Sequence, residues 1–170
     1  MSLGDTYAAL TGSHDSEKSL LFSKYFKEKA DQVMVENTVL YDGVKETLES
    51  LRAGGMKIGI VTTKFHYRIE QILSKFGALE LVDLIVGAED VKLEKPDPEG
   101  LLWAIEHIGA CKENILYVGD SLVDAKTAQN AKVRFAAVLT GTTTREEFEK
   151  YPHMVITENV SCLHGFILGL

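Results

Sequence analysis

The chain has 170 residues, 45% of them hydrophobic, which suits one domain with a buried core, or one domain with a small appendage. Its formal net charge of −7 argues against a nucleic-acid partner or an anionic membrane surface, because both select basic faces. The sequence shows no membrane-span pattern and no signal-peptide core near Met1. The two cysteines, Cys111 and Cys162, lack metal-ligand spacing, so we expect small buried thiols in a reduced, cytoplasmic protein.

The first forty residues differ in pattern from the rest of the chain. Ser16–Asp31 is charged and amphipathic, and its apolar residues fall near helical spacing, which predicts one helix. Residues 32–40 form a connector with an ambiguous pattern. A second helix is expected at Val44–Arg52, with Asp42 as its N-cap.

From Met56 onward, strand and helix patterns alternate. The predicted strands are Met56–Thr63, Leu84–Gly87, Ile115–Val118, Phe135–Leu139 and Met154–Thr157. The predicted helices are Phe65–Phe76, Pro98–Ile108 (with Asp97 as N-cap), Val123–Ala131, Thr144–Tyr151 and a last one capped by Ser161. This alternation predicts an α/β fold, in which a parallel sheet carries helices on both faces.

The strand at Ile115–Val118 runs directly into Gly119-Asp120, and a helix follows. Asp120 is therefore expected at the carboxyl end of a buried parallel strand, where open α/β sheets bind ligands. Asp124 lies one helical turn further on and can point to the same place. Such a carboxylate pair suits Mg²⁺. The ordinary structural explanation is that Asp120 caps the helix and Asp124 is solvated.

Two other predicted strands also end in polar side chains. Thr62 and Thr63 close the strand that begins at Met56, and Lys95 lies in the loop after the next strand. Taken singly, such a threonine is usually a helix cap and such a lysine a solvated loop residue. Together with Asp120 and Asp124 they form a set suited to a phosphate and a metal, in which Thr62 binds phosphoryl oxygens and Lys95 neutralises developing charge.

Three motifs in this order resemble a known family. Val-Thr-Thr-Lys at 61–64, Lys-Pro-Asp-Pro at 95–98 and Gly-Asp-Ser-Leu-Val-Asp at 119–124 are similar to the second, third and fourth motifs of the haloacid dehalogenase superfamily. The similarity is greatest to the branch of phosphoglycolate phosphatases and pyrophosphatases, and it extends from about Tyr41 to the C-terminus.

The resemblance implies a Rossmann-like, three-layer α/β/α fold. It divides the chain into a remnant of a helical cap with its connector (1–40) and an α/β core (41–170). It also implies Mg²⁺-dependent hydrolysis of a small phosphate ester through an aspartyl-phosphate. The partner that it implies is therefore a small phosphorylated metabolite. By this resemblance Thr62, Thr63 and Lys95 bind phosphate, Lys95 being also catalytic, and Asp120 and Asp124 serve the metal.

The first motif of the family is not found in this chain. That motif is an apolar strand followed by Asp-x-Asp-x-Thr, and it carries the attacking aspartate. Gly4-Asp5-Thr6 has one aspartate, without a preceding apolar strand or a second carboxylate two positions later. We therefore expect a truncated or degenerate chain with little activity alone, since the remaining groups can only bind and polarise.

The missing motif also removes a strand, which in the family is central and lies between the strands that contain Ile58 and Ile115. Unpaired strand edges favour association with other chains. We expect these two strands either to pair directly or to be separated by an added segment. That segment would come from another copy, giving a homodimer or strand-swapped oligomer, or from a separate piece.

Two alternatives to a phosphohydrolase remain at this point. One is a non-catalytic descendant that binds Mg²⁺ and phosphate and serves as a regulatory or oligomerising module. The other is a receiver-like phospho-acceptor domain, which also uses an acidic pair, a hydroxyl and a lysine. A receiver would need its acidic pair on the first strand and its lysine last, whereas the order in this chain is hydroxyl, lysine, acidic pair.

Overall fold

A computed structural model describes residues 3–167 and 169 of the chain. The chain divides into two compact units, Met1–Val39 and Leu40–Leu170. Across the described residues, no helix combines the length and the apolar character that crossing a bilayer requires.

The first unit is a pair of helices. Helix α1 covers Leu3–Thr11 and helix α2 covers Ser16–Asn37, with the Asp15 side chain capping α2 by accepting from two backbone amides. The ring of Tyr7, the buried residue of α1, lies 5.7 Å from the ring of Phe22. Helix α2 continues six residues beyond the predicted end at Asp31, because residues 32–37 contain neither glycine nor proline to stop it.

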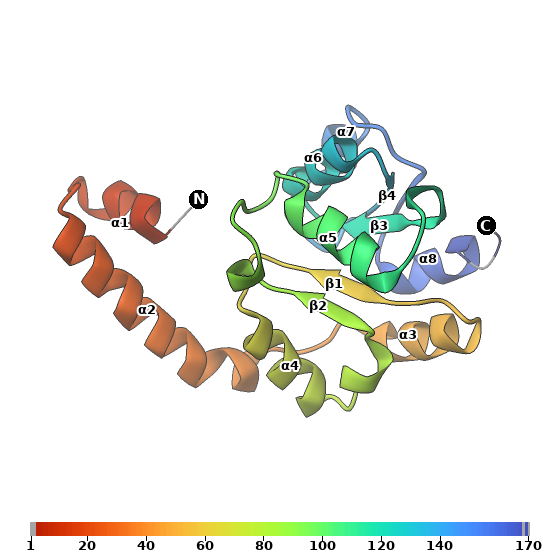
Figure 1. Ribbon diagram of the computed structural model, residues 1–170, viewed down its shortest axis with the longest axis horizontal. Coiled ribbons are helices and arrows are strands. Elements are labelled where there is room, and N and C mark those ends of the chain that lie inside the picture. Colours follow the sequence, from red (N-terminus) through yellow and green to blue (C-terminus); the bar gives the residue numbers. More distant parts are fainter. Residues whose placement is uncertain (1–2, 168, 170) are drawn as a thin grey trace. The chain divides into compact units, whose positions relative to one another are not determined.

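The second unit alternates strands and helices, as the sequence predicted (Figure 1). Its strands are β1 (Gly59–Val61), β2 (Leu84–Val86), β3 (Leu116–Gly119), β4 (Arg134–Val138) and β5 (Val155–Thr157). Its helices are α3 (Val44–Ala53), α4 (His66–Lys75), α5 (Glu99–Ile108), α6 (Leu122–Ala131), α7 (Arg145–Phe148) and α8 (Val160–Ile167). Short 3₁₀ turns occupy Leu79–Leu81, Ala88–Asp90 and Lys112–Asn114.

The strands form two parallel sheets. Strands β1 and β2 pair in one, with Ile60 opposite Ile85, and the order β3-β4-β5 makes up the other. In the part of the chain that the structure describes, no strand lies between β1 and β3, and these two do not pair (Figure 1). Of the two alternatives that the sequence predicted for these strands, the structure therefore excludes direct pairing.

Helices cover both faces of the sheets in a three-layer α/β/α arrangement. On one face, α6 and α7 pack against β3–β5 through Ala125, Ala128, Phe135 and Phe148. On the opposite face, α8 places Leu163 against β4. Around β1 and β2, α4 packs on one face and α5 on the other. This packing covers the faces of the strands. The polar loops at the strand ends are therefore the part of this unit where a ligand site is expected.

Several predicted caps and burials differ from the structure. The N-cap of α3 is Gly43, at a φ of 75°, rather than Asp42, and the Asp42 carbonyl instead accepts from Ser161 Oγ. Ser161 lies inside α8 and does not cap it. Both cysteines are exposed rather than buried, because each lies near the end of a helix at the surface.

Candidate active site

Lys95 connects the carboxyl ends of β1 and β3. It lies in the loop between β2 and α5, and its Nζ donates to Asp124 Oδ1 at 2.7 Å, to Val61 O at 3.2 Å and to Tyr117 Oη at 3.3 Å. An ammonium group has three N–H donors, so these three bonds use all of them. The ordinary explanation of a solvated loop lysine therefore does not apply, and the lysine joins residues from both sheets.

Asp124 receives hydrogen bonds on both of its carboxylate oxygens. Oδ1 accepts from Lys95 and from Tyr117 Oη at 3.1 Å, while Oδ2 accepts from Ser121 Oγ at 2.6 Å. Burial by itself would raise the pKa of the Asp124 carboxyl, but the charge of Lys95 and these hydrogen bonds hold that pKa below its ordinary value. Asp124 is therefore a buried, ionised group and not a solvated one.

Asp120 follows β3 directly, and its surroundings require glycine at two positions. A Cβ at Gly119 would overlap the Asp124 side chain, and a Cβ at Gly141 would overlap the Asp120 carbonyl and approach its carboxyl group. Ser121, not Asp120, is the N-cap of α6. The Asp120 carboxylate is thus exposed and does not serve as a cap.

Tyr117 belongs to the same cluster, although the sequence analysis did not select it. The alternation of side chains along β3 places Tyr117 on the face covered by α5 and α6, where it lies near Leu101 and Ala125. Burial, followed by the nearby Asp124 and Asp120 charges, raises the pKa of the Tyr117 hydroxyl well above its ordinary value. It is therefore a neutral donor. A tyrosine within an otherwise aliphatic strand was the available signal.

Thr62 and Thr63 line a small hollow together with Lys95, Gly87 and Asp97. The Thr62 hydroxyl accepts from the Lys64 amide at 3.1 Å, which leaves its own hydrogen to donate. At the start of α4, the amide of His66 donates to Glu89 Oε1 at 2.9 Å. This amide at the start of α4 is therefore already bonded to a carboxylate, Glu89, that the sequence analysis did not identify.

Asp120 and Asp124 are the candidate ligands for Mg²⁺. Mg²⁺ in phosphoryl-transfer sites is held by one or two carboxylates, and water and substrate phosphate complete its shell. Residues 3–167 and 169 contain no group of three or more His, Cys, Asp or Glu side chains arranged to hold a metal. Asp120 fits as a direct ligand, whereas Asp124, already accepting from three donors, fits as a supporting residue.

This combination of a parallel α/β fold with threonines, a lysine and an acidic pair after the strands is typical of the haloacid dehalogenase-like family. The family model of haloacid dehalogenase-like hydrolases matches residues 1–138, and the chain belongs to this family.

Related proteins support the same assignment. A phosphoglycolate phosphatase of Cereibacter sphaeroides is 44% identical over 104 residues, which cover 61% of this chain and 47% of the relative. The pyrophosphatase PpaX of Listeria innocua is 31% identical over 137 residues, covering 81% of this chain and 61% of the relative. The chain thus spans about half to three-fifths of the length of these relatives.

A solved structure shows the same fold. The crystal structure described as a haloacid dehalogenase-like hydrolase from Bacteroides fragilis superposes with a TM-score of 0.89 at 41% sequence identity. The match covers 95% of this chain and 77% of the other.

Proposed function

We propose that this protein contributes the phosphate and metal site of a Mg²⁺-dependent phosphohydrolase that acts on a small phosphorylated metabolite. The observation that carries the proposal is the position of Lys95, which bonds Asp124 and lines the same hollow as Thr62 and Thr63. The names of the relatives, phosphoglycolate phosphatase and pyrophosphatase, suggest a small phosphate ester or anhydride as substrate.

Each residue has a distinct proposed role. Thr62 donates its hydroxyl hydrogen to a phosphoryl oxygen, with Thr63 beside it. Lys95 supplies positive charge next to the phosphoryl group, where negative charge increases in the transition state. Asp120 holds Mg²⁺ and Asp124 fixes Lys95. When bound, Mg²⁺ neutralises charge on the phosphate oxygens.

These residues alone are proposed to turn over little substrate. Hydrolysis through an aspartyl-phosphate needs a carboxylate that is free to attack phosphorus. Asp124 already accepts three hydrogen bonds, and Asp120 is assigned to the metal. Binding, rather than turnover, is therefore the activity expected of the 170-residue chain.

The test is calorimetric titration of inorganic phosphate in the presence and absence of Mg²⁺. Mg²⁺-dependent binding is expected for the unmodified chain and for the control Glu106→Gln, whose side chain is exposed on α5. Binding is expected to be lost in Asp120→Asn and in Lys95→Met. The proposal would be rejected if the affinity for phosphate were the same with and without Mg²⁺ and the same in Asp120→Asn.

Phosphate release from phosphoglycolate, pyrophosphate and an aryl phosphate completes the test. The expected rate is close to the rate without protein. Turnover that Asp120→Ala abolishes would support the hydrolase class and overturn the expectation of low activity. A chain that shows neither turnover nor Mg²⁺-dependent phosphate binding would contradict the proposed function.

A further inference from the structure

The loop that carries Lys95 is bonded to helix α6 at two consecutive residues. Lys95 Nζ donates to Asp124 Oδ1 at 2.7 Å. The carbonyl oxygen of the next residue, Pro96, accepts from Asn130 Nδ2 at 2.9 Å. Asp124 and Asn130 both belong to α6, and their separation in the sequence corresponds to about 9 Å along the helix axis. The side chain of Lys95 and the backbone of Pro96 therefore bind the same helix at two separate points.

The bond from Asn130 restrains the backbone next to Lys95. Pro96 has no N–H, and its carbonyl oxygen can only accept, so the amide nitrogen of Asn130 has to face it. The ring of a proline also restricts its φ to about −65°. A carbonyl that is held in place at Pro96 thus limits the orientation of the preceding peptide unit, and with it the position of the Lys95 Cα.

The part of the loop before Lys95 is held by another helix. Glu99, the first residue of α5, accepts from the Lys92 amide at 3.1 Å and from the Leu93 amide at 2.9 Å. Glu99 therefore binds the loop on one side of Lys95, and Asn130 binds it on the other. Lys95 lies between two side-chain anchors that come from two different helices.

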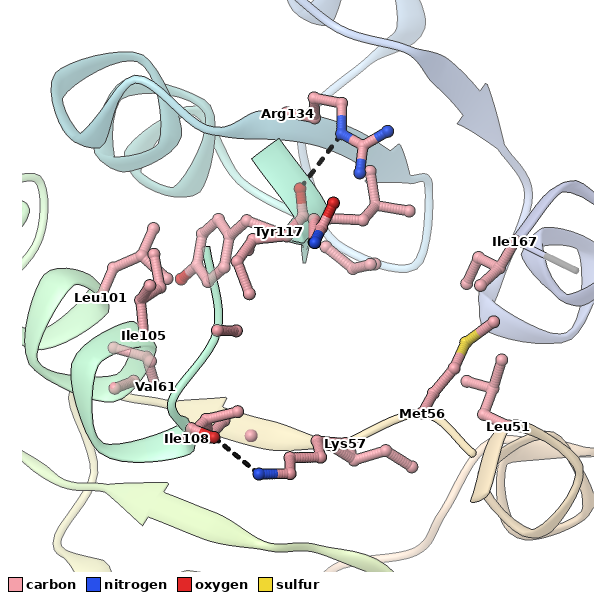
Figure 2. A pocket seen from close by; sticks show the side chains of 18 of the residues that line it. Leu51, Met56, Lys57, Val61, Leu101, Ile105, Ile108, Tyr117, Arg134 and Ile167 are labelled. Atoms are coloured by element: carbon pink, nitrogen blue, oxygen red, sulfur yellow. Dashed lines mark hydrogen bonds between the residues drawn. The ribbon is translucent and has the colours of Figure 1, made fainter. Parts of the chain in front are cut away.

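The acceptors around Lys95 do not come from one sheet. Val61 of β1 and Tyr117 of β3 both accept from Lys95 Nζ, and both line a mostly apolar cavity of about 540 Å³ between the two strands (Figure 2). Strand β1 belongs to one sheet and β3 to the other. The bond from Asn130 attaches the Lys95 loop to the helix that packs on the β3–β5 sheet, and this attachment does not depend on strand pairing.

A phosphoryl group that reaches Lys95 has to replace one of its partners. All three N–H donors of the ammonium group are used, by Val61 O, Tyr117 Oη and Asp124 Oδ1. The bonds to Val61 O and Tyr117 Oη, at 3.2 and 3.3 Å, are longer than the 2.7 Å bond to Asp124, which joins two opposite charges. The two longer bonds are therefore the ones that phosphate replaces. Once they are broken, the position of the ammonium depends more strongly on the backbone of the loop.

We infer that Asn130 is a positioning residue for Lys95. Its amide holds the Pro96 carbonyl on α6, so that the ammonium of Lys95 stays beside Asp124 while phosphate replaces its other partners. The inference rests on the proposed function where it concerns phosphate, whereas the restraint on Lys95 can be measured without phosphate. The loss of one such hydrogen bond corresponds to an about two- to tenfold change in an equilibrium constant.

The test variant is Asn130→Asp. It keeps the shape of the side chain and replaces the N–H donor by a carboxylate oxygen, which is repelled by the Pro96 carbonyl. The matched control is Gln129→Glu, which makes the same change of charge at the neighbouring exposed position of α6. Both variants are made in the full chain and are compared with the unmodified protein.

The first measurement is hydrogen exchange of the Lys95 ammonium group, followed by NMR on chains with ¹⁵N-labelled lysine and without phosphate. The Lys95 signal is assigned as the one that is absent from Lys95→Met. In Asn130→Asp this ammonium group should exchange about two- to tenfold faster than in Gln129→Glu, because its hydrogen bonds open more often. Equal exchange rates in the two variants would overturn the inference.

The second measurement is calorimetric titration of inorganic phosphate in the presence of Mg²⁺. Asn130→Asp should bind phosphate about two- to tenfold more weakly than Gln129→Glu. The affinity for Mg²⁺ alone should be the same in both variants, because Asp120 directly follows β3 and lies outside the loop. Equal phosphate affinities, or an equally large loss of Mg²⁺ affinity, would contradict the inference. If no form of the chain binds phosphate, the proposed function fails, and the ammonium exchange alone decides whether Asn130 positions Lys95.

Discussion

Lys95 Nζ and Asp124 Oδ1 form a buried ion pair at 2.7 Å, with exposed side-chain fractions of 16% and 8%. The pair joins the β2–α5 loop to the first turn of α6. Through the further bond from Lys95 to Val61 O it also reaches β1. One short contact, together with this bond, thus connects elements of both sheets.

Asp124→Asn is expected to destabilise the protein by about 3 kcal/mol at pH 7, because it leaves the Lys95 ammonium buried without its counter-charge. The pKa of Asp124 is lowered in the folded state, so its stabilising effect is present above the unfolded pKa of about 3.9 and is lost as the pH falls through the folded value. The difference in unfolding free energy between the unmodified chain and Asp124→Asn should therefore become smaller below about pH 4. Urea unfolding at several pH values measures it.

Asp120→Asn is the matched control for that experiment. Its carboxylate is exposed, so a change within about 0.5 kcal/mol is expected. An equal loss of stability in both variants would show that the Lys95 pair does not carry the effect.

Tyr117→Phe should cost about 1–2 kcal/mol, because it removes a buried hydroxyl that donates to an ionised carboxylate. The same change should raise the pKa of Asp124 toward its ordinary value, since that hydrogen bond lowers it. Carbon-detected NMR titration of the aspartates measures this shift. Tyr151→Phe, a partly buried tyrosine outside the cluster, should leave the pKa of Asp124 in place.

Lys132→Gly should stabilise the protein by roughly 0.5–1 kcal/mol. Lys132 ends α6 in the left-handed conformation, with φ 58° and ψ 48°, and its side chain is exposed. Glycine adopts this conformation without the Cβ penalty. Thermal unfolding measures the gain, and Lys132→Ala, which keeps a Cβ, should not reproduce it.

Both cysteine thiols should react with a thiol reagent in the native protein, because Cys111 and Cys162 are exposed. Without denaturant, the absorbance change of the reagent at saturation should correspond to two thiols per chain. In Cys111→Ser this absorbance change should be half as large. Reaction that requires denaturant would show that the thiols are buried.

The sequence predicted the local elements well because their causes are local. The apolar run before Gly119 predicted β3, and the end of α5 at Ile108 was found at the residue expected. The predicted boundaries of helices were wrong where a residue distant in the sequence determines them. Gly43 replaced Asp42 as the cap of α3 because the Asp42–Gly43 turn packs against Ser161, 118 residues after Gly43 in the chain, which no local pattern reveals.

The candidate site divides in the same way. The motifs that contain Thr62, Lys95, Asp120 and Asp124 were sufficient to predict the class of protein, because they resemble the motifs of a known family. That these residues gather at one edge follows from the parallel strands that precede them. Only the tertiary structure showed that Tyr117 completes the cluster and that Asp124 faces Lys95. Only the tertiary structure also showed that β1 and β3 do not pair and that both line a mostly apolar cavity. Strand pairing depends on backbone partners that are distant in the sequence, so no local pattern predicts it.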